Sequence, residues 1–325
     1  MDLGFWKRIK EDKKGEPLFV LAPMADVTDI AFRTLITKYG KPDVLWTEFV
    51  SADGLCSPGR KALLADLKFN KEEHPIVAQL FTSHPEKMEE AAALCRELGF
   101  DGIDINMGCP DRTIEKQGAG AAMIKNPTLA KEIIRAAKRG AKNIPVSVKT
   151  RIGYNKNEIN TWIPAILEED VAVLTLHART RKEMSLVPAR WEHVKEVVAM
   201  RDAMGKDTLI FGNGDAKSIS HARELAKESG ADGVMLGRAI FGNPWLFSEH
   251  TPSHTEKLKT MVEHTYLFEK ELGGIKNFSI MKKHYKAYVE GFLGAKELRM
   301  ELMETKNADE VEKIVTDFIS RALLT

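Results

Sequence analysis

Residues 75–108 read PIVAQLFTSHPEKMEEAAALCRELGFDGIDINMG, and this stretch contains a predicted strand, a predicted helix and a second predicted strand. Its two ends, 75–81 and 102–108, are short runs of apolar and β-branched residues, a pattern typical of buried strands. Between them, 85–99 has a helical pattern that ends in glycine, a favoured helix stop. The stretch therefore predicts one strand–helix–strand unit of a parallel sheet.

The same unit recurs along the whole chain. Apolar runs predict eight strands, at 17–24, 44–50, 75–81, 102–108, 145–151, 172–178, 208–214 and 233–239. Helical patterns such as 218–230 lie between them, and eight repeats of strand and helix favour an α/β fold, the (β/α)8 TIM barrel. The alternative is a doubly wound open sheet, whose usual glycine-rich turn after the first strand is replaced here by APMADVTD, 22–29.

The strand signal stops after Trp245, and the rest of the chain shows amphipathic helical patterns. At 325 residues the chain has room for one core of about 250 residues and a smaller domain. We therefore expect an N-terminal extension at 1–16, a barrel at 17–250 and a small all-helical C-terminal domain at 251–325.

The composition is that of an ordinary soluble globular protein, with 43% hydrophobic residues, 29% charged residues and a net charge of +1. Any nucleic-acid site must then be a local basic patch. Three cysteines are too few for a disulfide framework, and no apolar run reaches the roughly 18 residues of a membrane span. No histidine or cysteine cluster has metal-ligand spacing. We expect a cytoplasmic monomer without a metal.

Active sites of such barrels are built at the C-terminal ends of the strands, where this chain places polar side chains and glycines. The candidates are Gln79, Asn106, Cys109, Lys149, Arg151, His177, Arg179, Arg181, Asn213, Gly214, Asp215, Gly237 and Arg238. Any one of them alone could be a satisfied polar residue or a tight turn. Their shared position favours one site.

Two of these segments predict a phosphate-bearing cofactor. GNGD at 212–215 and GRA at 237–239 carry glycines that let backbone N–H groups approach an anion, and tight turns are the alternative. Lys149 could stabilise negative charge on a cofactor ring, or it could be a surface lysine.

Cys109 lies in the loop NMGCP, 106–110, next to this predicted site. An ordinary thiol has a pKa of about 8.5 and is mostly protonated near neutral pH, so Cys109 is a candidate general acid. Cys95 falls in a helical pattern and is predicted to be buried. Cys56 has no assigned role.

Six ordered motifs closely resemble the tRNA-dihydrouridine synthase family. They are APMADVTDIAFR (22–33), INMGCPDRTIEKQGAGAAMIKNP (105–127), VSVKTR (146–151), LHARTR (176–181), GNGD (212–215) and GVMLGRAIFGNPWLF (233–247). The segment 281–302, which has a helical pattern, is also similar to that family. The segment KEMSLVPARWEHV at 182–194 differs from many members.

The resemblance implies an FMN-containing barrel that reduces the C5–C6 bond of tRNA uridines with NADPH. Hydride would pass from the reduced flavin to C6 of a uracil drawn out of its stack, and Cys109 would protonate C5. The cofactor residues it implies are Pro23, Met24 and Ala25 against the flavin ring, Gln79 and Lys149 at its polar edge, and Asn213, Gly214, Asp215, Gly237 and Arg238 at the ribityl phosphate.

For the substrate, the resemblance implies that Asn106 binds the base and that His177 and Arg179 lie at the flavin and substrate face. Arg151 and Arg181, from the same motifs, are further substrate candidates.

A basic patch between 276 and 299 holds six cations, Lys276, Lys282, Lys283, Lys286, Lys296 and Arg299, against Glu290 and Glu297. With the resemblance, Lys282, Lys283, Lys286 and Arg299 are expected to contact tRNA phosphates, although a solvated helix face is the alternative.

Two other functions stay open at this stage. One is an FMN barrel enzyme acting on a free pyrimidine, similar to dihydroorotate dehydrogenase. The other is a non-catalytic, flavin-bound RNA-binding protein, which the presence of both Cys109 and Lys149 disfavours.

Overall fold

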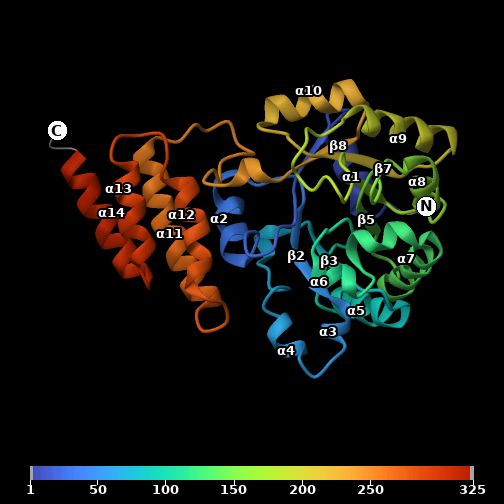
Figure 1. Cartoon of the computed structure of the whole chain (residues 1–325), viewed down its shortest axis with the longest axis horizontal. Coiled ribbons are helices and arrows are strands. Elements are labelled where there is room, and N and C mark those ends of the chain that lie inside the picture. The colour runs from blue at the N-terminus through green and yellow to red at the C-terminus, as the bar shows by residue number, and fades with distance from the viewer. Residues whose placement is uncertain (1–2, 323–325) are drawn as a thin grey trace. The chain divides into compact units, whose positions relative to one another are not determined.

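The computed structural model describes residues 3–322 and contains one eight-stranded parallel sheet (Figure 1). All eight predicted strands are present, each within a few residues of its predicted bounds. They are β1 (Leu18–Leu21), β2 (Leu45–Ser51), β3 (Ile76–Phe81), β4 (Gly102–Met107), β5 (Val146–Arg151), β6 (Val173–His177), β7 (Leu209–Asn213) and β8 (Gly233–Leu236).

The sheet is a closed barrel. Strands β2 to β8 follow one another in chain order, and β1 pairs in parallel with β8. The remaining seam, between β1 and β2, is bridged by Asp43, whose N–H donates to the Phe19 oxygen at 3.0 Å and whose carboxylate accepts from the Phe19 N–H at 2.8 Å. The predicted (β/α)8 barrel is confirmed, and the open doubly wound sheet is excluded.

Helices connect the strands as the sequence predicts. They are α2 (Ile30–Gly40), α3 (Ala52–Leu55), α4 (Arg60–Leu63), α5 (Pro85–Glu97), α6 (Arg112–Lys116), α7 (Pro127–Ala141), α8 (Ile159–Leu167), α9 (Glu192–Ala203) and α10 (Ile219–Ser229). Local chemistry sets their ends. Helix α10, for example, begins where the Ser218 side chain accepts from the His221 N–H and ends at Gly230 with φ of 71°.

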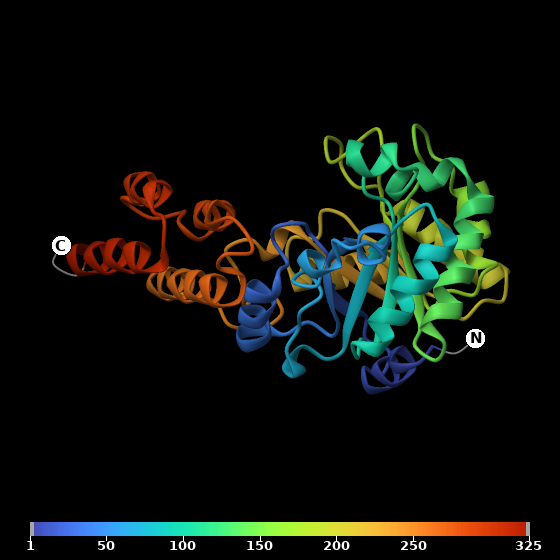
Figure 2. The same ribbon diagram turned by 90° about the horizontal axis from the view of Figure 1, so that it is seen from below.

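An additional helix, α1 (Phe5–Asp12), lies at the end of the barrel where the strands begin (Figure 2). Its Trp6 is 1% exposed, with ring centroids 5.8 Å from Trp46 and 5.6 Å from Phe211. A buried aromatic side chain of this size removes a large apolar area from water. The N-terminal extension thus contributes directly to the barrel core, which the sequence pattern did not predict.

Within residues 3–322 the chain forms two compact units. The barrel unit comprises the residues up to Pro23, Pro42–Leu67 and His74–Gly237. The helical unit comprises Met24–Lys41, Lys68–Glu73 and the chain from Arg238 onward. Helix α2 therefore groups with the C-terminal helices, although it follows the first barrel strand in the sequence. The assignment of residues 17–250 to a catalytic domain and of 251–325 to a tRNA-binding domain remains a proposal.

The helical unit contains α11 (His254–Leu272), α12 (Met281–Tyr288), α13 (Ala295–Glu304) and α14 (Ala308–Ala322). An aromatic cluster joins three of its helices. The Phe32 ring of α2 stacks on His264 of α11 at 4.7 Å, and His264 meets His284 of α12 at 4.5 Å. Both histidines are fully buried. Burial lowers the pKa of His284 to about 3 and that of His264 well below its ordinary value, so both imidazoles are neutral.

Candidate active site

Several of the polar side chains predicted from the strand ends lie opposite one another along one rim of the barrel. In the strand register Asn106 lies opposite Lys149, Arg151 opposite His177, and His177 opposite Asn213. Because neighbouring parallel strands end at the same rim, four consecutive strands, β4 to β7, contribute to one surface.

A buried hydrogen-bond series leads from the barrel interior to the Cys109 loop. Asp104 accepts from Gln79 Nε2 at 2.6 Å, and Gln79 Oε1 accepts from Asn106 Nδ2 at 3.0 Å. Asn106 Oδ1 then accepts from the N–H groups of Gly108 at 3.1 Å and Cys109 at 2.9 Å. The Asn106 side chain therefore holds the Cys109 loop and connects it to the buried side chains of β3 and β4.

Asp104 was not among the residues predicted from the sequence. It lies in β4, is fully buried, and accepts a second hydrogen bond from the Ser147 hydroxyl at 2.6 Å. Burial raises the pKa of its carboxyl to about 6, while the bonds from Ser147 and Gln79 act in the opposite direction. The one available signal was a lone carboxylate inside the apolar run GIDINM.

Lys149 places a partly buried cation at this rim. Its Nζ donates to Asn213 Oδ1 at 3.2 Å, and Asn213 in turn donates to the Met235 oxygen at 2.7 Å. Burial, together with nearby Arg151, lowers the pKa of Lys149 to about 8. A partly buried ammonium that contacts an amide oxygen suits an electron-rich ligand, such as the polar edge of a cofactor ring.

The Cys109 thiol is partly buried, and burial raises its pKa above the ordinary value. Lys149 and Arg151 oppose that shift without reversing it. The thiol is therefore protonated near neutral pH and suited to donating a proton. Cys95 is fully buried, as predicted. Cys56 is partly buried, and its thiol pKa is raised to about 11, mainly by burial.

Arg151, predicted to bind substrate, is 6% exposed and donates to backbone carbonyls. Its Nε contacts the Gly108 oxygen at 2.7 Å, and its Nη1 contacts the oxygens of Thr180 at 3.1 Å and Met184 at 2.9 Å. Since Gly108 belongs to the Cys109 loop, Arg151 ties this loop to the segment after β6. Burial lowers the pKa of Arg151 to about 10.

The other two predicted arginines also meet protein acceptors. Arg179, 2% exposed, donates to Asp215 at 2.6 Å and to the Val187 oxygen at 2.6 Å, and its Nη1 lies 3.1 Å from His177 Nε2. A guanidinium only donates, so His177 Nε2 is the acceptor in this contact.

Arg181 forms a two-pronged ion pair with Glu115 of α6, with its Nε 2.7 Å from Glu115 Oε1. Arg179 and Arg181 thus fix the segment after β6, which contains the sequence departure at 182–194. Glu115 was not among the predicted residues.

The predicted cofactor segments follow the ends of β1, β7 and β8. Gly214, with φ of 122°, and Asp215, with φ of 57°, follow β7 directly. Pro23 follows β1, Gly237 follows β8, and Arg238 begins a short 3-10 helix. Immediately after Pro23, the Met24 N–H donates to Thr28 Oγ1 at 2.9 Å, with Ala25 within that turn.

The predicted basic patch is partly committed to internal contacts. Lys282 donates to the Met303 oxygen, Arg299 donates to the Val289 oxygen at 2.6 Å, and Lys283 lies 3.2 Å from Asp26. Lys286 is exposed. Lys283 and Lys286 are therefore the cations that α12 presents most openly.

The comparisons with known proteins are decisive for the family. Residues 20–323 match the family model described as dihydrouridine synthase.

The chain belongs to the dihydrouridine synthase family.

Curated relatives in this family are similar over nearly their whole length. The chain is 41% identical over 323 residues to a probable tRNA-dihydrouridine synthase of Staphylococcus aureus (strain Mu50), covering 98% of this chain and 96% of that protein. It is 40% identical over 325 residues to probable tRNA-dihydrouridine synthase 2 of Bacillus subtilis (strain 168), covering 98% and 97%.

Solved structures share the fold at low identity. A morphinone reductase mutant in complex with tetrahydroNAD matches with a TM-score of 0.50 and 13% identity, over 70% of this chain and 85% of that one. Histamine dehydrogenase from Rhizobium sp. 4-9 matches with a TM-score of 0.53 and 12% identity, over 77% and 48%. Membership of the family therefore rests on the family model and the curated relatives, and these structures support the barrel.

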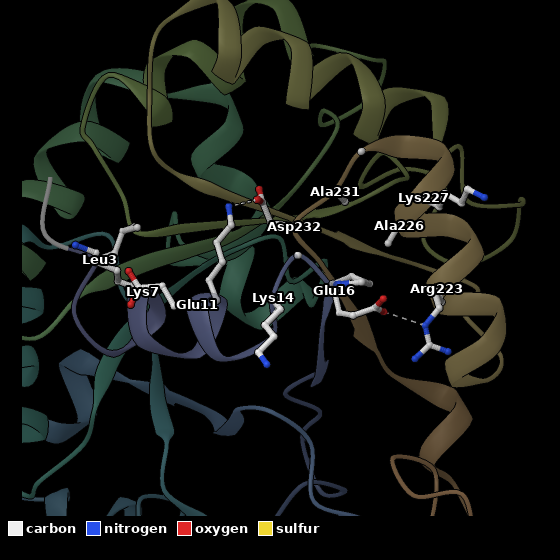
Figure 3. Close-up of a pocket in the computed structure, with 14 residues that line it drawn as sticks. Leu3, Lys7, Glu11, Lys14, Glu16, Arg223, Ala226, Lys227, Ala231 and Asp232 are labelled. Atoms are coloured by element: carbon white, nitrogen blue, oxygen red, sulfur yellow. Dashed lines mark hydrogen bonds and ion pairs between the residues drawn. The ribbon is translucent and has the colours of Figure 1, made fainter.

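A cavity of about 780 Å³ lies at the opposite, N-terminal end of the barrel (Figure 3). Charged side chains of α1 and α10 surround it, and two pairs cross it, Lys10 with Asp232 at 2.6 Å and Arg223 with Glu16 at 3.3 Å. It contains none of the rim residues and is separate from the candidate site.

Within residues 3–322, no group of three or more His, Cys, Asp or Glu side chains is arranged to hold a metal ion. In the same residues, no helix has both the length and the apolar character needed to cross a membrane.

Proposed function

We propose that this protein is an FMN-dependent tRNA-dihydrouridine synthase that reduces the C5–C6 bond of uridines in tRNA, with NADPH as the reductant. The observation that carries the proposal is the protonated, partly buried Cys109 thiol on the same rim as the partly buried ammonium of Lys149. The names of the curated relatives support the tRNA substrate.

The cofactor residues are proposed on their placement. Lys149 and His177 would face the flavin ring, and Pro23, Met24 and Ala25 would pack against it. Gln79, expected at the same edge, is 0% exposed and bonded to Asp104 and Asn106, so we assign it to holding Asn106. Asn213, Gly214, Asp215, Gly237 and Arg238 would hold the ribityl chain and phosphate. When bound, FMN supplies the hydride that the reduction requires. Lys149 supplies a positive charge at the polar edge of the ring, where negative charge develops.

Cys109 acts as the general acid in this proposal. Its sulfur holds the proton that C5 of the uracil receives, and burial keeps that proton in place at neutral pH. Asn106 would bind the uracil. Asn106 also accepts a hydrogen bond from the Cys109 N–H. The proposed base-binding residue and the proposed acid are therefore linked directly.

tRNA is proposed to be held by two sets of residues. Lys282, Lys283, Lys286 and Arg299 would contact phosphates, which attract cations irrespective of sequence. The three predicted substrate arginines are already bonded to protein acceptors. We therefore assign Arg151, Arg179 and Arg181 chiefly to holding the loops around the substrate. The uridine must leave its stack to reach the rim, at a cost on the order of a few kcal/mol.

We propose a cytoplasmic location and a monomeric state. The rival enzymatic function, reduction of a free pyrimidine, has no structural observation in its favour. The non-catalytic alternative is opposed by the intact pair of Cys109 and Lys149.

One experiment separates these functions. The purified protein, reconstituted with FMN, is given NADPH and either tRNA lacking dihydrouridine, free uridine or orotate, and products are measured by mass spectrometry. We expect dihydrouridine in tRNA alone. Reduction of the free pyrimidines would favour the rival enzyme, and flavin binding without reduction of any substrate would favour the non-catalytic protein.

A further inference from the structure

The hydrogen bonds of the buried series between Cys109 and Asp104 all run the same way, with each donor pointing toward Asp104. Its members are Asp104, Gln79, Asn106 and the backbone of Gly108 and Cys109. Gln79 is 0% exposed and Asn106 is 7% exposed, so water scarcely competes for these bonds. Buried polar groups of this kind are costly when they lose their partners.

Both ends of the series require the same direction. A carboxylate only accepts hydrogen bonds, so Gln79 must turn its donor Nε2 toward Asp104. Its acceptor Oε1 then faces Asn106. At the other end, the backbone N–H groups of Gly108 and Cys109 only donate, so Asn106 must turn its acceptor Oδ1 toward them. Asn106 Nδ2 is then left to face Gln79. The two amides have one orientation that satisfies every bond.

We propose that Asp104 is a positioning residue for the Cys109 loop, because its acceptor oxygen holds Gln79 in the orientation in which Oε1 accepts from Asn106 Nδ2. Without an acceptor at position 104, Gln79 Nε2 loses its bond in this series, and Gln79 can turn away from Asn106. Asn106 then loses its anchor in the strand interior, and the loop that depends on Asn106 Oδ1 is released. The role of the loop in catalysis rests on the proposed function, whereas its position does not.

The deciding variant is Asp104→Leu, which keeps the branched shape of the side chain and removes both acceptors. Gln79→Leu breaks the same series one step later and serves if Asp104→Leu does not fold. Asp104→Asn should preserve the direction, because its oxygen can accept from Gln79 while its amide donates to the Ser147 hydroxyl. Ser147→Ala lies outside the path from Asp104 to Cys109 and is the matched control.

The readout is the rate at which iodoacetamide alkylates Cys109, followed by mass spectrometry across pH in the full-length protein. Burial raises the Cys109 pKa, so a released loop should lower that pKa and speed alkylation, about tenfold at a fixed pH for each unit of fall. We expect this in Asp104→Leu and Gln79→Leu. Asp104→Asn and Ser147→Ala should stay close to the unmodified protein.

Wild-type alkylation in Asp104→Leu, or in Gln79→Leu if the first variant does not fold, overturns the proposal. So does an Asp104→Asn protein that behaves like Asp104→Leu, since the acceptor would then not be the cause. Turnover is measured in parallel, with a loss of about 10²-fold expected when the acid is misplaced. Faster alkylation with unchanged turnover would retain the positioning role and refute the acid role of Cys109.

Discussion

The backbone N–H of Cys109 donates to the side-chain oxygen of Asn106 across 2.9 Å. The proposed acid and the proposed base-binding residue are therefore fixed to each other within one short loop after β4. This coupling gives the first prediction, because the thiol can be removed without disturbing a backbone contact.

Replacing Cys109 by alanine should abolish most tRNA reduction while leaving flavin binding and NADPH oxidation unchanged. A positioned general acid contributes about 10²- to 10⁴-fold, so dihydrouridine formation should fall by that factor in single-turnover assays. Cys56→Ala is the matched control, since Cys56 is likewise partly buried and lies in a different loop. Wild-type turnover in Cys109→Ala would remove the acid assignment.

The affinity for FMN should depend on the protonation of Lys149. Its pKa of about 8 means that the ammonium is present below that pH and lost above it. Binding measured by quenching of flavin fluorescence should therefore weaken as the pH rises through about 8. Lys149→Met should bind FMN weakly and without this dependence. An affinity that stays constant from pH 7 to pH 9.5 in the unmodified protein would contradict the role.

The buried histidines His264 and His284 predict a loss of stability in acid. Both have a lowered pKa in the folded protein, so below about pH 6.5 the unfolded chain binds protons that the folded chain does not. Each should then reduce the free energy of unfolding by up to about 1.4 kcal/mol per pH unit.

Urea unfolding between pH 7 and pH 5 measures this effect. His284→Leu should remove about half of the slope, and His250→Gln, which changes an exposed histidine, should leave it intact. If His284→Leu shows the same slope as the unmodified protein, the buried pair is not its source.

Charge reversal on α12 should weaken tRNA binding. Lys283→Glu and Lys286→Glu change the two most open cations of the patch, whereas Lys282 holds the Met303 oxygen and its loss would also disturb packing. Affinity should fall, and its dependence on salt should become less steep, because fewer counterions are released. Lys195→Glu, an exposed lysine of α9 in the barrel unit, is the control with an equal charge change. Equal salt dependence in the unmodified protein and in all three variants would exclude the patch.

The sequence predicts the barrel well because strand and helix periods are local properties. Runs such as 102–108 and 208–214 are visible in the sequence itself, and the strand-end rule then places Lys149 and Asn213 on one rim. The contact between those two side chains, at 3.2 Å, is a consequence of this shared position.

Partners that depend on register across strands could not be predicted in the same way. Asp104 contacts Gln79 because β3 and β4 pair these residues directly, and no local pattern shows that. Arg151 looks like a substrate cation in VSVKTR, yet its guanidinium holds three carbonyls from two loops. The grouping of α2 with the C-terminal helices likewise depends on long-range packing, through Phe32.

The central claim is that this chain reduces uridine in tRNA through Cys109. Mapping dihydrouridine by mass spectrometry in bulk tRNA from cells lacking the gene, then carrying either the unmodified gene or the Cys109→Ala variant, tests it most directly. We predict that dihydrouridine at specific positions disappears in the deletion, returns with the unmodified gene, and stays absent with the variant. Unchanged dihydrouridine in the deletion, in cells with no second synthase, would contradict the account.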